Sequence, residues 1–122
     1  MREIIFRGKT EAGNWVEGTG IAIGEQGVRI HYSDHVNVLV IPETVGQYTG
    51  FVDKNGKKIF EGDIVSIYNS KAFLFAVEWN NQYVLKCTSN GVSDNILNVI
   101  ESPEDVEVVG NIYDNSELIK EQ

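Results

Sequence analysis

The stretch TVGQYTGFVDKNGKKIFEGDIV, from Thr44 to Val65, decides the fold because it holds the clearest turn in the chain. Within it, Asp53–Gly56 has aspartate at the first position and glycine at the fourth. That pattern is typical of a type I turn that ends in a left-handed glycine. Apolar residues flank the turn, with Phe51 before it and Ile59 after it. The stretch therefore predicts a β-hairpin at its centre.

The stretch ends in Glu61, Gly62 and Asp63, which open a strand predicted to begin at Ile64. Two carboxylates that act as general acid and base need separate environments and a cleft between them. Glu61 and Asp63 are two residues apart, so at the start of a strand they would point the same way and repel. We favour a structural role, in which Gly62 takes a special backbone conformation and the acids accept hydrogen bonds from amides. The whole stretch is interpreted as a structural hinge between two β-rich halves.

Short apolar runs separated by turn residues continue outside this stretch, and the whole chain is predicted to form up to nine short strands. Gly18 and Gly20 lie inside one such run, which indicates a bulge, a sharp bend or the close approach of another backbone. The run Val38–Ile41 is interpreted as a buried strand. Phe73–Trp79 is interpreted as a central strand, buried on both sides for most of its length.

Helical patterns are few. Ser93–Ile100 has apolar residues at helical spacing and Asp94 as a candidate cap, so it predicts the one interior helix. Ser116–Gln122 predicts a short terminal helical turn. The expected fold is all-β dominated with one or two short helices, in a single domain 1–122 with a β-rich N-terminal half at about 1–50 and a C-terminal half at about 51–122.

Composition and charge exclude several classes of protein. The chain has 122 residues, 42% of them hydrophobic and 23% charged, which is ordinary for a globular domain. A single cysteine, Cys87, excludes an intrachain disulfide and suits a reducing cytosol. No run has the apolar core of a signal peptide or the length of a membrane span. We therefore expect a soluble, cytoplasmic protein with no membrane partner.

The formal net charge of −8 is unevenly placed. Residues 1–93 carry ten acidic and nine basic side chains, whereas residues 94–122 carry eight acidic side chains and only Lys120 as a base. Non-specific nucleic-acid binding needs a basic face, and none is visible, so nucleic acid is an unlikely partner. The acidic last quarter is either a solvated surface or a binding surface, and the sequence leaves both open.

Taken together, these residues resemble the YopX family of phage and prophage-encoded proteins. The resemblance lies in segments spread along the chain: 1–7, 15–16, 45–50, 53–56, 59–65, 77–79 and 108–115. Six residues of these segments form the structural signature: Gly46, Gly50, Asp53, Gly56, Gly62 and Gly110.

The resemblance implies a bifurcated antiparallel sheet folded into barrel-like halves, and assembly into homo-oligomers. It also implies a mobile-element origin, and hence the cytoplasm of a host bacterium. It supplies no catalytic or binding residues. Separately, Glu61–Val65 followed by Val77–Trp79 looks like the start of a small SH3-like barrel, which favours an SH3-like second half, although fold alone does not give function.

Candidate sites for chemistry are weak. His31 and His35 are four residues apart, but in a strand and a loop that spacing separates them, which disfavours a metal pair. Asp53–Gly56 lacks the later ligands of a calcium loop. Cys87 has no cue for a lowered pKa and is interpreted as a small buried hydrophobe. We expect no catalytic residues, no metal and no cofactor, and hence no enzyme.

Aromatic residues offer one candidate for recognition. Tyr48, Phe51, Phe60 and Trp79 could form a binding face, although core packing is the commoner role of such residues. The candidate interaction surface comprises four residues: Tyr48, Glu61, Asp63 and Trp79.

These observations favour a non-enzymatic phage accessory protein that acts through contacts with host or phage proteins or through self-assembly. The alternative is a nucleic-acid-associated module, either a small-barrel binder that uses Tyr48 or an acidic mimic of nucleic acid.

Overall fold

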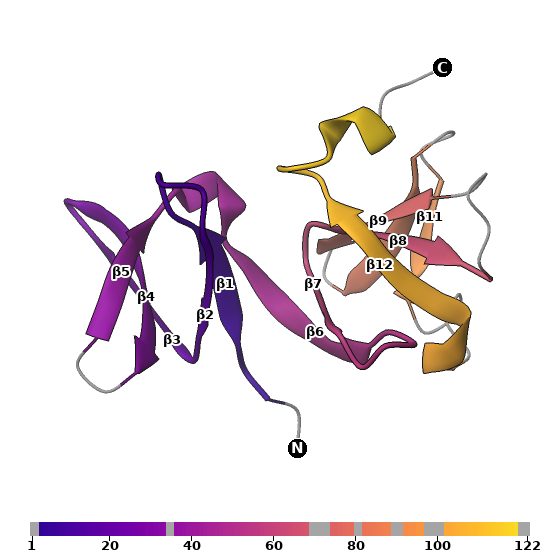
Figure 1. The fold of residues 1–122 in the computed structure, drawn as a ribbon, viewed down its shortest axis with the longest axis horizontal. Coiled ribbons are helices and arrows are strands. Elements are labelled where there is room, and N and C mark those ends of the chain that lie inside the picture. The colour runs from indigo at the N-terminus through magenta and orange to yellow at the C-terminus, as the bar shows by residue number, and fades with distance from the viewer. Residues whose placement is uncertain are drawn as a thin grey trace. The chain divides into compact units, whose positions relative to one another are not determined.

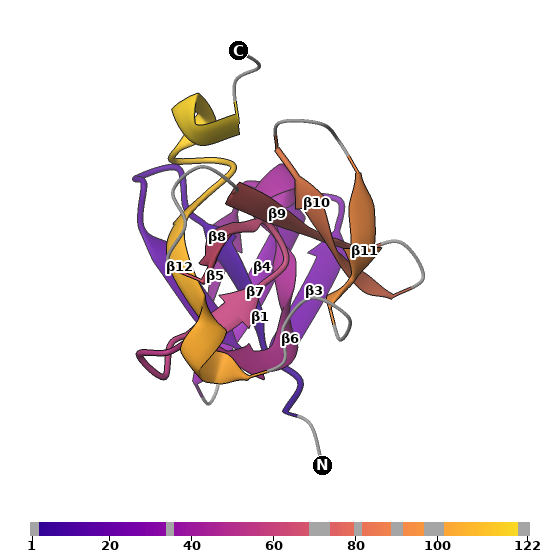
Figure 2. The same ribbon diagram turned by 90° about the vertical axis from the view of Figure 1, so that its right-hand side faces the viewer.

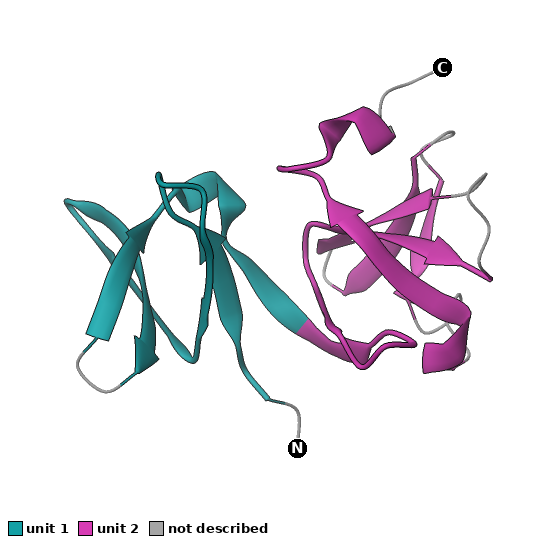
Figure 3. Ribbon diagram, in the orientation of Figure 1, with its two compact units in different colours: residues 1–48 teal, residues 49–122 magenta. Residues whose placement is uncertain are grey.

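The computed structural model describes residues 3–33, 36–68, 74–79, 82–88, 92–96 and 102–119. Its fold is all-β, with a curled half-barrel sheet and other antiparallel sheets (Figure 1). This confirms the predicted fold class. The chain divides into two compact units, Met1–Tyr48 and Thr49–Gln122 (Figure 3). That the units make up one domain stays a prediction, as does an SH3-like second half.

Unit 1 consists of short antiparallel strands and one 3-10 helix. Its elements are β1 (Phe6–Lys9), β2 (Trp15–Gly18), β3 (Gly20–Gly24), β4 (Gly27–Ser33), β5 (Val36–Val40), η1 (Pro42–Thr44) and the first residues of β6 (Gly46–Val52). β3, β4 and β5 form a three-stranded sheet in that order. β1 pairs with β2 and, through Arg7 and Phe6, with Gly46 and Gln47 of β6.

Small residues allow the strands of unit 1 to pack closely. A Cβ at Gly8 would lie 3.0 Å from side-chain atoms of Ile30 and Val40, which are 0% and 3% exposed. A Cβ at Gly18 would overlap the carbonyl oxygen of His31. The two glycines thus leave room for β4 and β5 against β1 and β2. Of the alternatives predicted for Gly18, the close approach of another backbone is confirmed.

Unit 2 is built on a five-stranded antiparallel sheet in the order β11-β10-β9-β8-β12. Figure 2 shows β10 between β9 and β11. The elements of the unit beyond β6 are β7 (Lys58–Phe60), β8 (Asp63–Ile67), β9 (Leu74–Trp79), β10 (Tyr83–Cys87), β11 (Ser93–Asn95), η2 (Pro103–Asp105), β12 (Val106–Asn111) and η3 (Ser116–Ile119). Its core contains Ile59, Val65, Ile67, Val77, Tyr83, Leu85, Ile96 and Val106.

Three sequence-based expectations need correction. Twelve strands lie in the described residues rather than up to nine. β5 is an edge strand, so of its residues only Val40 is buried, and Leu39 is 39% exposed. In β9, Ala76 and Val77 are buried as expected, but the strand ends in exposed Glu78 and Trp79.

The predicted interior helix is wrong over Ser93–Asn95, which form strand β11. Pairing with Val84, Leu85 and Lys86 of β10 overrides the helical spacing of this segment. Asp94 accepts a hydrogen bond from the adjacent Asn95 N–H instead of capping a helix. Ile96 is helical, as predicted, and residues 97–100 of that prediction lie outside the described residues. The terminal helical turn is confirmed over Ser116–Ile119.

Candidate interaction site

The Asp53–Gly56 turn has the predicted geometry. The Gly56 N–H donates to the Asp53 carbonyl over 2.9 Å, and Gly56 has a φ of 77°. Asp53 is only 2% exposed, and the Oδ1 of its carboxylate accepts hydrogen bonds from the N–H groups of Asn55 and Lys57, both at 2.9 Å. Its Oδ2 accepts from the N–H of Val108 in β12 at 3.0 Å. One carboxylate therefore fixes the turn and attaches it to a distant strand.

The same turn covers the outer edge of β12. The Lys54 N–H donates to the Val106 carbonyl over 2.9 Å, next to the bond between Asp53 and Val108. The Lys54 ammonium lies 3.4 Å from a carboxylate oxygen of Glu107. An open strand edge invites pairing with another chain, and these contacts occupy part of the edge that β12 would otherwise present.

Glu61, Gly62 and Asp63 form a tight connection inside unit 2. Gly62 has a φ of 94°, which favours glycine, and a Cβ there would lie 2.9 Å from Cε2 of Tyr113. Asp63 is 1% exposed, and its Oδ2 accepts a hydrogen bond from the Phe60 N–H at 2.8 Å. The predicted structural role of Gly62 and Asp63 is therefore confirmed. Asp53 and Gly62 form these hydrogen bonds with residues of unit 2, and the boundary between the two units lies within the Thr44–Val65 stretch, after Tyr48. That the stretch acts as a hinge stays a prediction.

The segment from Gly110 to Asn115 folds back on itself. Asn111 Oδ1 accepts from the N–H groups of Tyr113 and Asp114 at 3.0 and 2.9 Å. The Ile112 N–H donates to the Gly62 carbonyl over 2.9 Å, which joins this loop to the start of β8. A Cβ at Gly110 would lie 2.5 Å from Asn115 Oδ1. The signature glycines Gly62 and Gly110 are thus positions where a side chain would not fit.

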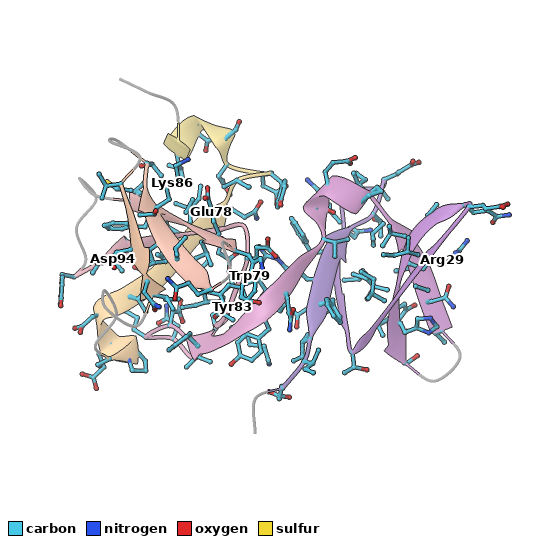
Figure 4. The ribbon with its side chains drawn as sticks, turned by 180° about the vertical axis from the view of Figure 1, so that it is seen from behind. Arg29, Glu78, Trp79, Tyr83, Lys86 and Asp94 are labelled. Carbon is cyan, nitrogen blue, oxygen red and sulfur yellow. The ribbon has the colours of Figure 1, made fainter. Side chains whose placement is uncertain are left out.

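An exposed aromatic residue lies at the end of β9. Trp79 is 56% exposed and pairs directly across the sheet with Tyr83 of β10, which is 8% exposed. Their rings meet edge to face, with centroids 4.8 Å apart and an interplanar angle of 66° (Figure 4). Offset and edge-to-face pairs contribute about 0.5–1.5 kcal/mol beyond the area they bury. The buried tyrosine therefore holds the indole in a defined position at the surface.

Charged residues lie beside this aromatic pair. Lys86 of β10 and Glu78 of β9 approach to 4.0 Å, each with its side chain 48% exposed (Figure 4). Glu78 is opposite Val84 in the register, one position from the Trp79–Tyr83 pair, so it projects from the other face of the sheet. Trp79 thus lies on the same face of the sheet as the core residues, but at the end of the strand, where its side chain is exposed to solvent.

The four residues predicted as an interaction surface have different environments. Tyr48 lies in unit 1 and is 7% exposed, and Asp63 in unit 2 is buried by the contacts above. Glu61 is half-buried. Burial removes Tyr48 and Asp63 from the surface of the chain and leaves Trp79 as its exposed aromatic member. Tyr83 was not predicted for this surface, although its place four residues after Trp79 could have identified it as a partner on the next strand.

Two hollows lie on unit 1. One of about 490 Å³ is lined by Ile5, Glu17, Gly18, Thr19, His31, Tyr32 and Ser33. A second of about 280 Å³ is lined by Glu11, Gln26, Gly27, Leu39, Val40, Ile41 and Pro42. His31 is half-buried, and His35 lies outside the described residues. Within the described ranges, no three His, Cys, Asp or Glu side chains cluster in a way that could hold a metal ion. Cys87 is buried, as predicted.

Comparison with known proteins agrees with the resemblance seen in the sequence. A family model described as YopX protein matches residues 6–120. No curated protein matches the chain. Among the helices of the described residues, none has the length and apolar character needed to cross a membrane.

Proposed function

This chain belongs to the YopX family, and on that premise we propose that it is a non-enzymatic accessory protein of phage or prophage origin that acts through contacts with other proteins. Its partners are host or phage proteins and further copies of itself. Its place of action is the cytoplasm of the host bacterium.

The observation that carries this proposal is the exposed Trp79. Tryptophan and tyrosine are enriched among the few residues that supply most of the binding energy in protein interfaces. A large aromatic side chain held in one position also loses little conformational entropy when a partner covers it. Trp79 meets both conditions, because it is 56% exposed and packs against the buried Tyr83.

The charge of the chain supports a protein partner over a nucleic acid. Glu78 adjoins Trp79 in sequence and Asp94 is exposed on β11, while the whole chain has a formal net charge of −8. Binding to a phosphate backbone depends on displacing counterions with basic side chains. The proposed partner therefore presents an apolar pocket for the indole, with neutral or basic residues around it.

The test is affinity capture from lysate of the host bacterium, with the wild-type chain and Trp79→Ala as parallel baits and quantitative mass spectrometry as the readout. We expect at least one protein to be enriched by the wild type and reduced about tenfold or more with Trp79→Ala, since truncation of a binding hot spot costs about 2 kcal/mol or more. Val109→Ala is the matched control, because Val109 is a 41% exposed apolar residue of the same unit.

Equal capture by the wild type and Trp79→Ala would remove Trp79 from the interface. Nuclease treatment of the lysate distinguishes the small-barrel form of the alternative, because a nucleic-acid binder would lose the proteins that it captures through nucleic acid when the nucleic acid is digested. A protein contact survives that treatment.

A further inference from the structure

β3 is an edge strand without the usual protection. Within the described ranges, its one strand neighbour is β4, and no other backbone hydrogen bond is made by residues 20–24. The strand carries no charged residue and no proline, the two residue types that most often block edge pairing. Ile23 is 80% exposed. An unpaired row of N–H and C=O groups beside exposed apolar side chains fits another β-strand.

The sequence of β3 reads the same in both directions. It is Gly20-Ile21-Ala22-Ile23-Gly24, with Ala22 at the centre. In an antiparallel pair of two such strands centred on Ala22, each glycine faces the other glycine and Ile21 of one copy faces Ile23 of the other. Ala22 faces itself. Isoleucine pairs stabilise antiparallel sheets, and a two-fold axis requires this self-complementarity.

We propose that two copies of this chain associate by antiparallel pairing of β3 with β3, about a two-fold axis at Ala22. The proposal rests on the self-association included in the proposed function, and it names the surface that self-association uses. Pairing joins the two three-stranded sheets into one continuous six-stranded sheet. Ile21 and Ile23 lie on the same face as the buried Ile30, so the pairing extends the apolar side of the sheet.

Charge does not oppose this pairing. The nearest charged residue after β3 is Glu25, which in this register faces the neutral Thr19 of the second copy. Arg29 on β4 is opposite Ala22 in the monomer. In the dimer the two Arg29 residues are separated by three strand spacings, about 14 Å, which exceeds the Debye length of about 8 Å at physiological ionic strength.

The edge strands β5, β11 and β12 are less suited to the same role. β5 reads Val-Asn-Val-Leu-Val, so self-pairing would place Asn37 against Leu39. Its pairing with β4 also contains an irregularity between His31 and Ser33, which distorts that side of the sheet. In unit 2, β11 is three polar residues long, and the Asp53 turn covers β12. β3 combines an open edge with a self-complementary sequence.

The first test is the mass of the purified chain by light scattering over a concentration series. A five-residue strand pair is smaller than a standard interface, so we expect a dissociation constant of about 10–100 μM and a mass that approaches twice 13.6 kDa at high concentration. Ile23→Lys should raise that constant about tenfold or more, because it places a charge against Ile21 of the second copy. Leu39→Lys, an exposed apolar residue of the opposite edge, should change it less than threefold.

The second test fixes the register by disulfide formation. Directly opposite residues in an antiparallel pair have Cα atoms about 4.5–5.5 Å apart, within the range that a disulfide spans. Ala22→Cys should therefore cross-link to a covalent dimer under mild oxidation. Gly24→Cys is the matched control, because in this register its two copies are about 13 Å apart. Oxidation of the wild type measures any cross-linking through the native, buried Cys87.

A chain that stays monomeric at about 1 mM, or an Ala22→Cys variant that cross-links no faster than Gly24→Cys, would overturn the proposal. So would a dimer that Ile23→Lys leaves intact. Trp79→Ala is expected to leave the mass unchanged. Failure of the β3 contact and failure of the Trp79 contact are therefore separate results.

Discussion

Asp53 and Val108 are 55 positions apart, yet the Asp53 carboxylate accepts a hydrogen bond from the Val108 N–H at 3.0 Å. The other oxygen of that carboxylate accepts two bonds from the turn that Asp53 itself begins. A buried carboxylate that accepts three backbone N–H groups is costly to remove, because each amide is left without its partner.

Asp53→Ala is expected to lower the free energy of unfolding by about 3 kcal/mol, since three hydrogen bonds to a charged group are lost. Asp53→Asn should cost less, because Oδ1 can still accept from both N–H groups of the turn. Only the bond from the Val108 N–H is lost, since the new NH2 group cannot accept it. Urea denaturation measures both losses, and hydrogen exchange at the Val108 amide localises them. Glu25→Ala, at an exposed position, is the control. A stable Asp53→Ala variant would contradict the role assigned to this carboxylate.

Gly62→Ala and Gly56→Ala separate backbone strain from side-chain overlap. Both glycines have positive φ values, 94° and 77°, but a Cβ meets nothing within 4 Å at Gly56 and lies 2.9 Å from Tyr113 at Gly62. We expect a loss of about 1 kcal/mol for Gly56→Ala and about 2–3 kcal/mol for Gly62→Ala. Adding Tyr113→Ala to Gly62→Ala should recover the difference. Equal losses at the two glycines would show that the Tyr113 contact is unimportant.

Gly18→Ala tests the close packing in unit 1. Its Cβ would overlap the His31 carbonyl oxygen, whereas a Cβ at Gly20 meets the His31 side chain at 3.4 Å. Gly18→Ala should therefore cost about 4 kcal/mol or more and unfold unit 1, and Gly20→Ala about 1 kcal/mol or less. In a Trp79→Phe background, fluorescence of Trp15 reports on unit 1 alone. Similar unfolding of both variants would contradict this assignment.

Trp79→Ala should leave the fold largely intact. The side chain is 56% exposed, so its loss removes mainly the edge-to-face contact with Tyr83, about 1 kcal/mol. Leu85→Ala, at a residue 1% exposed in the same sheet, should cost about 3 kcal/mol. Thermal and urea denaturation compare the two. A large loss for Trp79→Ala would mean that reduced partner capture reflects unfolding.

The sequence was most informative where geometry is local. The Asp53–Gly56 turn and the special backbone at Gly62 follow from turn chemistry, in which each residue's conformation depends on its neighbours. Gly18 and Gly20 indicated a bulge, a sharp bend or a close approach, and at Gly18 the close approach is confirmed. The all-β class followed from many short apolar runs separated by turns.

Long-range contacts could not be predicted in this way. Nothing near Asp53 identifies Val108 as its partner, and nothing near Gly62 identifies Tyr113. The apolar residues of Ser93–Ile100 have helical spacing, but pairing with β10 makes Ser93–Asn95 a strand. The alternation of side chains along a strand predicts that Trp79 and Val77 lie on the same face. It does not predict that Val77 is buried while Trp79 is exposed. The candidate surface therefore lost Tyr48 and Asp63 to burial and kept Trp79.

The Asp53 turn also bears on the order in which the protein is made. A ribosome synthesises the chain from its N-terminus, so Asn55 and Lys57 are available to Asp53 long before Val108 has been added. The turn can thus orient its carboxylate while the last strand is still unmade. When β12 emerges, it meets an acceptor whose conformational entropy has already been lost. Asn55 and Lys57 therefore orient the carboxylate that later binds Val108, a residue 55 positions away.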